Sequence, residues 1–342
     1  MAQNFRRGAG GHRESARAAA REREPRASLY AEVTERIIAE LEAGRFPWVQ
    51  PWDSSAACPG LPRNAVSGRS YSGINVLLLW GAVIQHGHPS QGWLTFRQAL
   101  DAGGCVRKGE HGVTVCYADR FTPSPRLSND PSDRRNLGLA SPDAEKLRAV
   151  QTGDDPKTIP FLKRFIVFNV AQVDGLPERL TADPPPLPTC EIVPIVEDLI
   201  VASGADFRIG GAEAFYSPTG DYVQVPPQPA FRDQINYYRT VLHELGGHWT
   251  GHKSRLNRDL SSGFGTADYA REELIAELAS AYLCASLGIA PTVRHADYLG
   301  HWLAVLRADN RAIFKAASQA SKAADYLLAF QRQPYTEQDM AA

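Results

Sequence analysis

The sequence predicts an α+β protein with two domains: a small mixed α/β domain, then a largely helical domain that carries a small sheet. The chain has 342 residues, which is enough for two domains of ordinary size. Apolar residues recur at helical spacing in some segments and form short strand-like runs in others. The proline-rich stretch Pro184-Pro185-Pro186-Leu187-Pro188 separates the two halves. We therefore expect domains at 28–178 and 190–335, joined by a stiff linker at 179–189.

Composition limits the class of protein. Hydrophobic residues make up 43% and charged residues 22%, as in ordinary globular proteins, and the net charge is −1. Any binding of nucleic acid must therefore come from a local patch. The five cysteines are scattered without a Cys-x-x-Cys pair, which indicates thiols in a reducing compartment. There is no secretory signal pattern and no apolar run near 18 residues, so we expect a cytoplasmic protein with no membrane contact.

Residues 1–27 differ from the rest of the chain. They hold seven arginines, three glutamates and almost no large apolar side chains. This composition favours a disordered basic tail. The alternative is a basic arm that adds affinity for phosphates.

The first domain should begin with a helix at 29–41, because Leu29, Val33, Ile37 and Leu41 recur at helical spacing and Gly44 follows. The pattern then predicts further elements, in the following order: an extended aromatic loop at 46–52, helices at 75–85 and 95–102, a hairpin at 106–113 leading into a strand at 113–118, and a strand at 161–170. Residues 121–158 are polar and aperiodic, which is typical of a flexible insertion.

The second domain should be mainly helical. Its periodicity predicts helices at 190–203, 232–251 and about 266–287, a largely helical segment at 298–324, and short strands at 207–209 and 222–225. The strand at 222–225 precedes the helix at 232–251. It is either a plain core strand or an edge strand that could hold an extended peptide by backbone pairing.

The most informative segment is His243-Glu244-Leu245-Gly246-Gly247-His248. It is similar to the His-Glu-x-x-His zinc helix, with one extra residue. Histidines five residues apart lie 140° apart on a regular helix and cannot share an ion. A one-residue π-bulge would accommodate the extra position. The inserted position lies in Gly246-Gly247, and glycine adopts unusual backbone angles more easily than any other residue.

A third ligand is expected downstream, in Glu272-Glu273-Leu274-Ile275-Ala276-Glu277. Glu273 and Glu277 are one helical turn apart on one face. We assign His243, His248 and Glu273 as metal ligands, and Glu277 as the acid that hydrogen-bonds a ligand histidine and fixes its tautomer. Swapped roles, or the use of Glu272, are open alternatives.

If the metal keeps an open position, Glu244 would act as the general base on a water molecule there. His252 is an alternative partner of His248, but that pair would misplace Glu244. Tyr269, Tyr298 and His301 are candidate transition-state donors that spacing alone does not separate from core or surface residues.

Aromatic side chains cluster between residues 46 and 96, with basic and amide side chains interleaved, and Arg107-Lys108 follows. Such platforms beside cations suit sequence-independent binding of single-stranded nucleic acid. Trp80 and Trp93 are expected in the core, and the proline-bounded Trp48 and Trp52 are the better platforms. The predicted DNA contacts are Trp48, Trp52, Arg63, Arg69, Tyr71, Asn75, Arg97, Arg107 and Lys108.

Taken together, these segments resemble the ArdC family of antirestriction proteins, carried by conjugative plasmids. The N-terminal half is also similar to a module of the TraC plasmid primases. The resemblance covers about 28–330 and rests on Phe46-Pro47-Trp48, Pro51-Trp52, 68–75, 93–99, 106–110, 167–172, 243–252 and 272–278.

The resemblance implies a domain that binds single-stranded DNA, a zincin-like metallopeptidase domain with Zn²⁺ or another divalent metal, and protection of incoming plasmid DNA from host restriction. The chain departs from that family at Gly246-Gly247, where one residue more usually precedes the histidine. The longer His-Glu-x-x-x-His spacing resembles the dipeptidyl peptidase III metallopeptidases, which pair it with Glu-Glu-x-x-Ala-Glu. The segment 272–277 fits that second pattern, with Glu273 at the ligand position.

Three functional hypotheses follow from the resemblance. The first is a DNA-binding antirestriction protein with a metallopeptidase-like domain. The second is an active metalloprotease that cleaves a host protein beside the DNA. The third is a non-catalytic module that binds single-stranded DNA and holds a structural metal.

Overall fold

The computed structural model describes residues 28–49, 60–121, 159–182, 189–263, 265–289 and 298–332. The N-terminal tail, the predicted insertion at 122–158, Trp52, and residues 183–188 of the predicted linker lie outside these ranges. Among the described residues, no helix is long and apolar enough to cross a bilayer.

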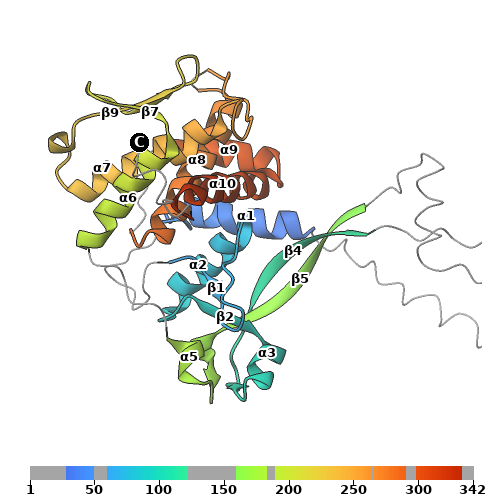
Figure 1. Cartoon of the computed structure of the whole chain (residues 1–342). Helices are drawn as coiled ribbons and strands as arrows, with labels where there is room; N and C mark the ends of the chain where they lie inside the picture. Colours follow the sequence, from blue (N-terminus) through green and yellow to red (C-terminus); the bar gives the residue numbers. More distant parts are fainter. Residues whose placement is uncertain are drawn as a thin grey trace, which may run out of the picture.

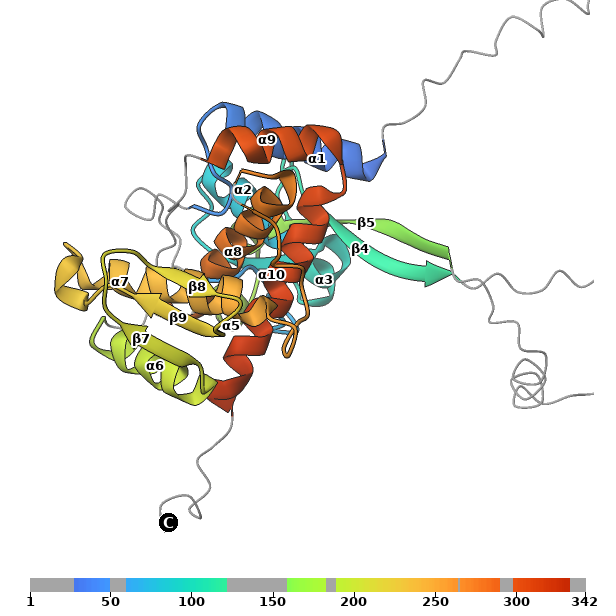
Figure 2. The same cartoon turned by 90° about the horizontal axis from the view of Figure 1, so that it is seen from above.

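The N-terminal half is a four-stranded sheet with helices. Strand order is β1-β2-β5-β4, formed by β1 (Arg63–Asn64), β2 (Gly92–Thr95), β4 (Val113–Phe121) and β5 (Ile159–Asn169). Helices α1 (Leu29–Glu42), α2 (Ile74–His86), α3 (Phe96–Asp101) and α5 (Glu178–Thr181) complete it. Strand β4 pairs antiparallel with β5 over residues 113–121 and 159–167, and the two strands extend away from the body of the molecule (Figures 1 and 2).

The predicted hairpin at 106–113 is wrong. Strand β3 (Cys105–Val106) pairs with β6 (Val173–Asp174), which is far away in the sequence. The turn after β3 is closed instead by Arg107, whose guanidinium contacts both Glu110 and Asp174. Residues 107–112 are therefore a loop between two different sheets.

The C-terminal half is mainly helical with a three-stranded sheet of order β7-β9-β8. Its strands are β7 (Asp206–Ile209), β8 (Phe215–Ser217) and β9 (Tyr222–Val225), and they lie beside α6 (Thr189–Ser203) and α7 (Gln234–Val241) (Figure 2). Strand β9 is central, so it is the buried strand of the two alternatives, and β8 is an edge strand. Helices α8 (Ala267–Ser286), α9 (Leu299–Ala308) and α10 (Ala312–Leu328) complete this half.

The two halves share one apolar core. Helix α1 packs against α9, and Trp48 lies edge-on to Trp302, both fully buried. Trp80 of α2 packs in the same way against Tyr282 of α8.

Hydrogen bonds at Gly73 add to the contact between the two halves. Its N–H donates to Ser321 Oγ at 2.8 Å, and its carbonyl accepts from Tyr282 Oη at 3.1 Å. Gly73 also adopts φ +59, a left-handed conformation that glycine tolerates without a side-chain clash. The expected boundary near residue 180 stays a prediction, and the contacts across it are extensive.

Candidate metal centre

The two motif histidines lie in a π-helix, η4 (Leu242–His248), that continues directly from α7. In a π-helix each N–H bonds the carbonyl five residues earlier, so side chains five residues apart return to one face. The imidazole rings of His243 and His248 accordingly lie with their centroids 5.2 Å apart. The predicted bulge is therefore confirmed, and it extends over the whole motif.

Gly247 sets how closely this π-helix approaches α8. A Cβ built at Gly247 would lie 2.5 Å from Ala276 Cβ and 2.6 Å from Ala276 Cα. Both distances are far below van der Waals contact. A glycine at this position is therefore what lets the motif reach the helix that carries Glu273.

Side chains from the following loop bind the carbonyls of the π-helix. Thr250 Oγ1 donates to Gly246 O at 2.7 Å, and Arg258 Nη2 donates to Gly247 O. Arg258 Nε also donates to Glu272 Oε2 at 3.0 Å. Burial raises the pKa of Glu272, and the Arg258 charge opposes that rise. The buried Arg258 guanidinium thus joins η4 to the start of α8.

Three donor groups converge between η4 and α8. His243 Nε2 lies 3.6 Å from Glu273 Oε2, and His248 Nε2 lies 3.6 Å from Glu273 Oε1. All three donor atoms lie within 4.8 Å of one another, and this is the metal-type cluster found among the described residues. Donors bound tetrahedrally at about 2.0–2.1 Å would lie about 3.3 Å apart, so the arrangement fits a divalent ion with little movement.

Glu277 lies on the opposite side of His243. Its Oε1 is 3.8 Å from His243 Nδ1, while Nε2 of the same ring faces Glu273. An acid in that position favours the tautomer with the proton on Nδ1, which leaves Nε2 to coordinate. Glu273 therefore lies beside Nε2 of His243 and Glu277 beside Nδ1. The assignment of Glu273 as ligand and Glu277 as its outer acid stays a prediction, and this geometry is compatible with it.

The cluster opens into a cavity of about 340 Å³. His243, Glu244 and His248 line it on one side, and residues 214–216 and 218 of the β8 region line another. Glu244 is only 6% exposed and lines the same cavity as the three donors. Asp259, Leu260, Ser262, Tyr269, Glu272, Glu273 and Tyr298 complete the wall.

Tyr269 and Tyr298 are the two predicted donors that reach this cavity. Their rings lie 5.8 Å apart. The pKa of Tyr269 is raised, chiefly by burial and then by hydrogen bonds with Tyr298 and Glu273. Tyr269 therefore stays protonated as a donor at neutral pH. The third candidate, His301, is exposed on α9 and does not line the described cavity.

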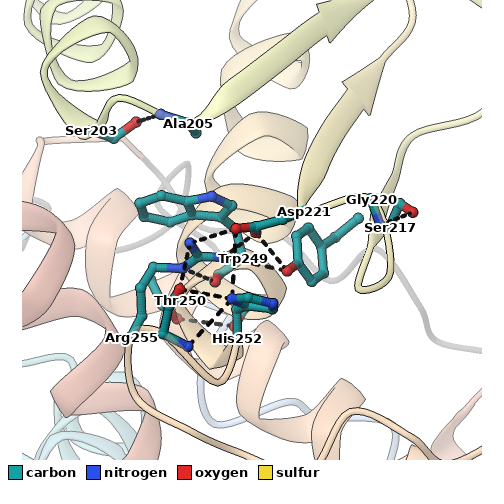
Figure 3. Close-up of polar contacts among 12 residues, drawn as sticks. Ser203, Ala205, Ser217, Gly220, Asp221, Trp249, Thr250, His252 and Arg255 are labelled. Atoms are coloured by element: carbon teal, nitrogen blue, oxygen red, sulfur yellow. Dashed lines mark hydrogen bonds and ion pairs between the residues drawn. The ribbon is translucent and has the colours of Figure 1, made fainter.

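A second polar cluster fixes the edge strand beside the cavity (Figure 3). The Arg255 guanidinium forms a two-pronged ion pair with Asp221 and lies 4.0 Å over the Trp249 ring. Tyr216 Oη of β8 donates to Asp221 Oδ1 at 2.8 Å. His252 Nδ1 lies 3.6 Å from Asp221 Oδ2, so His252 belongs to this cluster, which weighs against its alternative role as a ligand.

The predicted DNA contacts differ in how exposed their side chains are. Arg69, Arg97, Arg107 and Lys108 are exposed. The guanidinium of Arg107 nevertheless contacts two carboxylates, those of Glu110 and Asp174. Arg63 Nη2 donates to Ala182 O at 2.9 Å. Tyr71 is half-buried against the core around Trp93, and burial raises its pKa.

Two of the predicted contacts are structural instead. Trp48 is 0% exposed because Trp302 and neighbouring core residues cover it, so it offers no ring face for a base. Asn75 binds both backbone groups of Cys116, with Oδ1 accepting from its N–H and Nδ2 donating to its carbonyl, each at 2.8 Å. That pair of bonds attaches α2 to β4. Trp80 and Trp93 lie in the core, as expected.

The sequence interpretation overlooked the exposed rings on β4 and β5. Tyr117 is 56% exposed and Phe165 is 46% exposed. Strand alternation would have revealed them, because Val113, Val115 and Tyr117 share one face of β4.

Comparisons with known proteins match both halves of the chain. Residues 27–168 match the family described as the N-terminal domain of anti-restriction factor ArdC. Residues 194–319 match the family described as zincin-like metallopeptidase. The two matched ranges cover the N-terminal sheet and the candidate metal centre.

Several individual relatives are similar over most of the chain. Protein y4eC of Sinorhizobium fredii is 40% identical over 89% of this chain and 92% of its own length. A DNA primase TraC of Escherichia coli is 38% identical over 91% of this chain, which spans only 28% of that primase. The metal-free crystal structure of antirestriction ArdC from plasmid R388 is 40% identical, with a TM-score of 0.70 over 88% of this chain and 97% of that one. Its Mn(II)-bound structure is 39% identical, with a TM-score of 0.68 over 90% and 99%.

Proposed function

Because the chain belongs to the ArdC family of antirestriction proteins, we propose that it protects incoming plasmid DNA from host restriction in the cytoplasm. In this proposal the N-terminal half binds single-stranded DNA, and the C-terminal half is a zinc metallopeptidase that acts beside it. The observation that carries the enzymatic part is the convergence of His243, His248 and Glu273 in one cavity with Glu244.

The donor set supports zinc as the native metal. Two imidazoles and one carboxylate are typical of catalytic zinc sites, whereas manganese favours sites richer in oxygen. The R388 relative was solved with Mn(II), which also supports a divalent metal in this site. Metal analysis of the protein as purified, beside His248→Ala, tests this: zinc should be present at one per chain in wild type and lost in the variant.

A divalent metal bound here would polarise a carbonyl group and make a water molecule more acidic. Glu244 would then accept the proton of an attacking water, since its carboxylate lines the same cavity. Tyr269 would donate a hydrogen bond to the developing oxyanion, because its hydroxyl stays protonated. Glu277 would hold His243 in the coordinating tautomer.

The proposed substrate is an extended peptide segment. Strand β8 is the edge of the small sheet, and residues 214–216 and 218 border the cavity. An edge strand presents backbone groups that can pair with an added strand. The Asp221–Arg255 pair and Tyr216 would keep that edge at a fixed distance from the histidines.

Glu244→Gln separates catalysis from binding. The variant should keep its metal and its affinity for DNA, and lose peptidase activity by several orders of magnitude. An antirestriction phenotype unchanged in this variant would refute a catalytic requirement and favour a structural metal. The exposed residues Arg69 and Lys108 of the N-terminal half test DNA binding separately from catalysis. Their replacement by Ala should weaken binding to single strands and leave the metal in place.

A further inference from the structure

We propose that the exposed aromatic pair Tyr117 and Phe165, on one face of the β4–β5 ribbon, is a stacking site for unpaired DNA bases, with Lys163 beside it for the phosphate. The inference rests on the proposed binding of single-stranded DNA and names the site at which it occurs. It replaces the platform role that the sequence suggested for Trp48.

Strand register puts these side chains together. Tyr117 lies opposite Lys163, and Val115 lies opposite Phe165, in an antiparallel pair. Opposed residues project from the same face of a sheet, so Tyr117, Phe165 and Lys163 share one face. The two rings are in contact, with centroids 6.2 Å apart.

The side chains on this face of the ribbon pass from buried to exposed along each strand. At its base Val115 and Val167 are buried against α2 and Trp93. Two residues farther along each strand, Tyr117 of β4 and Phe165 of β5 are about half exposed, on the ribbon that extends from the body of the molecule (Figures 1 and 2). Large aromatic side chains usually cover their surface in a core or use it at an interface.

The geometry of the pair leaves ring surface for a ligand. The planes meet at 80°, so the edge of one ring meets the other and neither stacks flat on its partner. A base can therefore lie against an aromatic face, as in proteins that bind single strands without sequence preference.

The chemistry of this face favours unpaired DNA over duplex DNA. Bases in a duplex already stack on each other, so they offer no open face to a ring unless the strand is unpaired. Lys163, an exposed residue, lies opposite Tyr117 in the ribbon, and a cation at that position suits the phosphate that follows a stacked base. The opposite face of the ribbon is anchored differently, because Arg164 forms an ion pair at 2.9 Å with Glu32 of α1.

The test measures binding of a fluorescein-labelled oligo(dT) to the full chain by anisotropy, at several salt concentrations. Tyr117→Ala and Phe165→Ala should each weaken binding by about 5-fold to 150-fold, with the salt dependence nearly unchanged, because stacking releases no counterions. Lys163→Ala should instead lower the salt slope by about 1. Tyr117→Phe should bind like wild type.

Phe96→Ala is the matched control. Phe96 is an aromatic residue of the same half, 51% exposed, and it lies on α3 instead of the ribbon. All variants should keep the wild-type melting temperature and metal content. Illumination of an oligonucleotide that carries 5-iododeoxyuridine should attach it to peptides of β4 or β5.

The outcomes separate the two levels of the proposal. Wild-type protein that shows no preference for single strands over duplex would overturn the proposed DNA binding itself. Wild type that binds single strands, with Tyr117→Ala/Phe165→Ala binding equally well or Phe96→Ala equally impaired, would overturn only the stacking site.

Discussion

Replacing Gly247 with alanine should disrupt the metal centre while the protein remains folded. The added Cβ would lie 2.5 Å from Ala276 Cβ, whereas ordinary contact needs 3.4–4 Å. The π-helix and α8 must therefore separate by about 1 Å, because the opposing atoms belong to a rigid backbone and a methyl group. Overpacking of this kind costs about 1–3 kcal/mol, which is less than the stability of a typical domain.

The same displacement acts directly on the ligands. His248 follows Gly247 in η4, and Glu273 lies one turn before Ala276 on α8, so the distance of 3.6 Å between His248 Nε2 and Glu273 Oε1 would widen by a similar amount. Donors that far apart cannot both coordinate one ion at normal bond lengths. We expect the affinity for zinc to fall by about 100-fold or more, beyond the 10–100-fold cost of losing an outer hydrogen-bond partner.

A competition titration against a chromophoric chelator measures this affinity, and thermal unfolding with and without metal gives the stability. Gly300→Ala is the control, since nothing lies within 4 Å of a Cβ built there. Gly246→Ala should have a smaller effect than Gly247→Ala, because its Cβ meets the end of the Leu283 side chain, which can rotate away. Wild-type zinc affinity in Gly247→Ala, with an equal rise in melting temperature on metal addition, would refute the claim that this contact sets the ligand spacing.

Three further predictions concern other parts of the structure. Arg258→Met should destabilise the protein by about 3 kcal/mol in urea unfolding, because it leaves Glu272 buried without its ion-pair partner; a loss below 0.5 kcal/mol would contradict this. The hydrogen bond from Arg255 lowers the pKa of Asp221 below its ordinary value of 3.8. The Asp221–Arg255 interaction therefore stabilises the protein fully above pH 3.8, the ordinary pKa of the carboxyl group. This stabilisation is lost as the pH falls through the lower pKa of Asp221 in the folded protein, so Asp221→Asn should flatten the decline in melting temperature below about pH 4. Burial raises the pKa of the Cys116 thiol to about 11; peptide mapping after alkylation at pH 8 should show exposed Cys105 modified much faster than Cys116.

The local elements of this protein could be predicted because their signals are local. Apolar spacing located α1, and the five-residue interval between His243 and His248, together with two glycines, indicated the π-helix. The acidic pair Glu273 and Glu277 was found because residues one turn apart on a helix share a face. None of these inferences needed to know which segments are neighbours in space.

The features that sequence reasoning missed depend on distant partners. Trp48 resembled an exposed platform because its own loop is rich in proline, but the ring that covers it, Trp302, comes from the far end of the chain. The strand at 222–225 could not be ranked as edge or centre, because β8 has three residues, too few for periodicity to indicate a strand. The segment 298–324, expected to be largely helical, divides into α9 and α10 near Asn310, whose carbonyl accepts a hydrogen bond from Thr34 of α1. The local signal of that break is Asp309, whose Oδ1 accepts from the Arg311 N–H at 2.8 Å before α10 begins.

The shared core means that the two halves cannot be cut apart without cost. A fragment ending near residue 182 would expose the faces of α1, Trp48 and Trp80 that α8 and α9 now cover. The complementary fragment would lose the contact of Tyr282 with Trp80 on α8, the helix that carries Glu273, and the contact of Trp302 with Trp48 on α9. The chain should therefore unfold as one cooperative unit, in which a ligand that stabilises either half also raises the melting temperature of the other. Metal and DNA would then be linked through stability alone, without any contact between their sites.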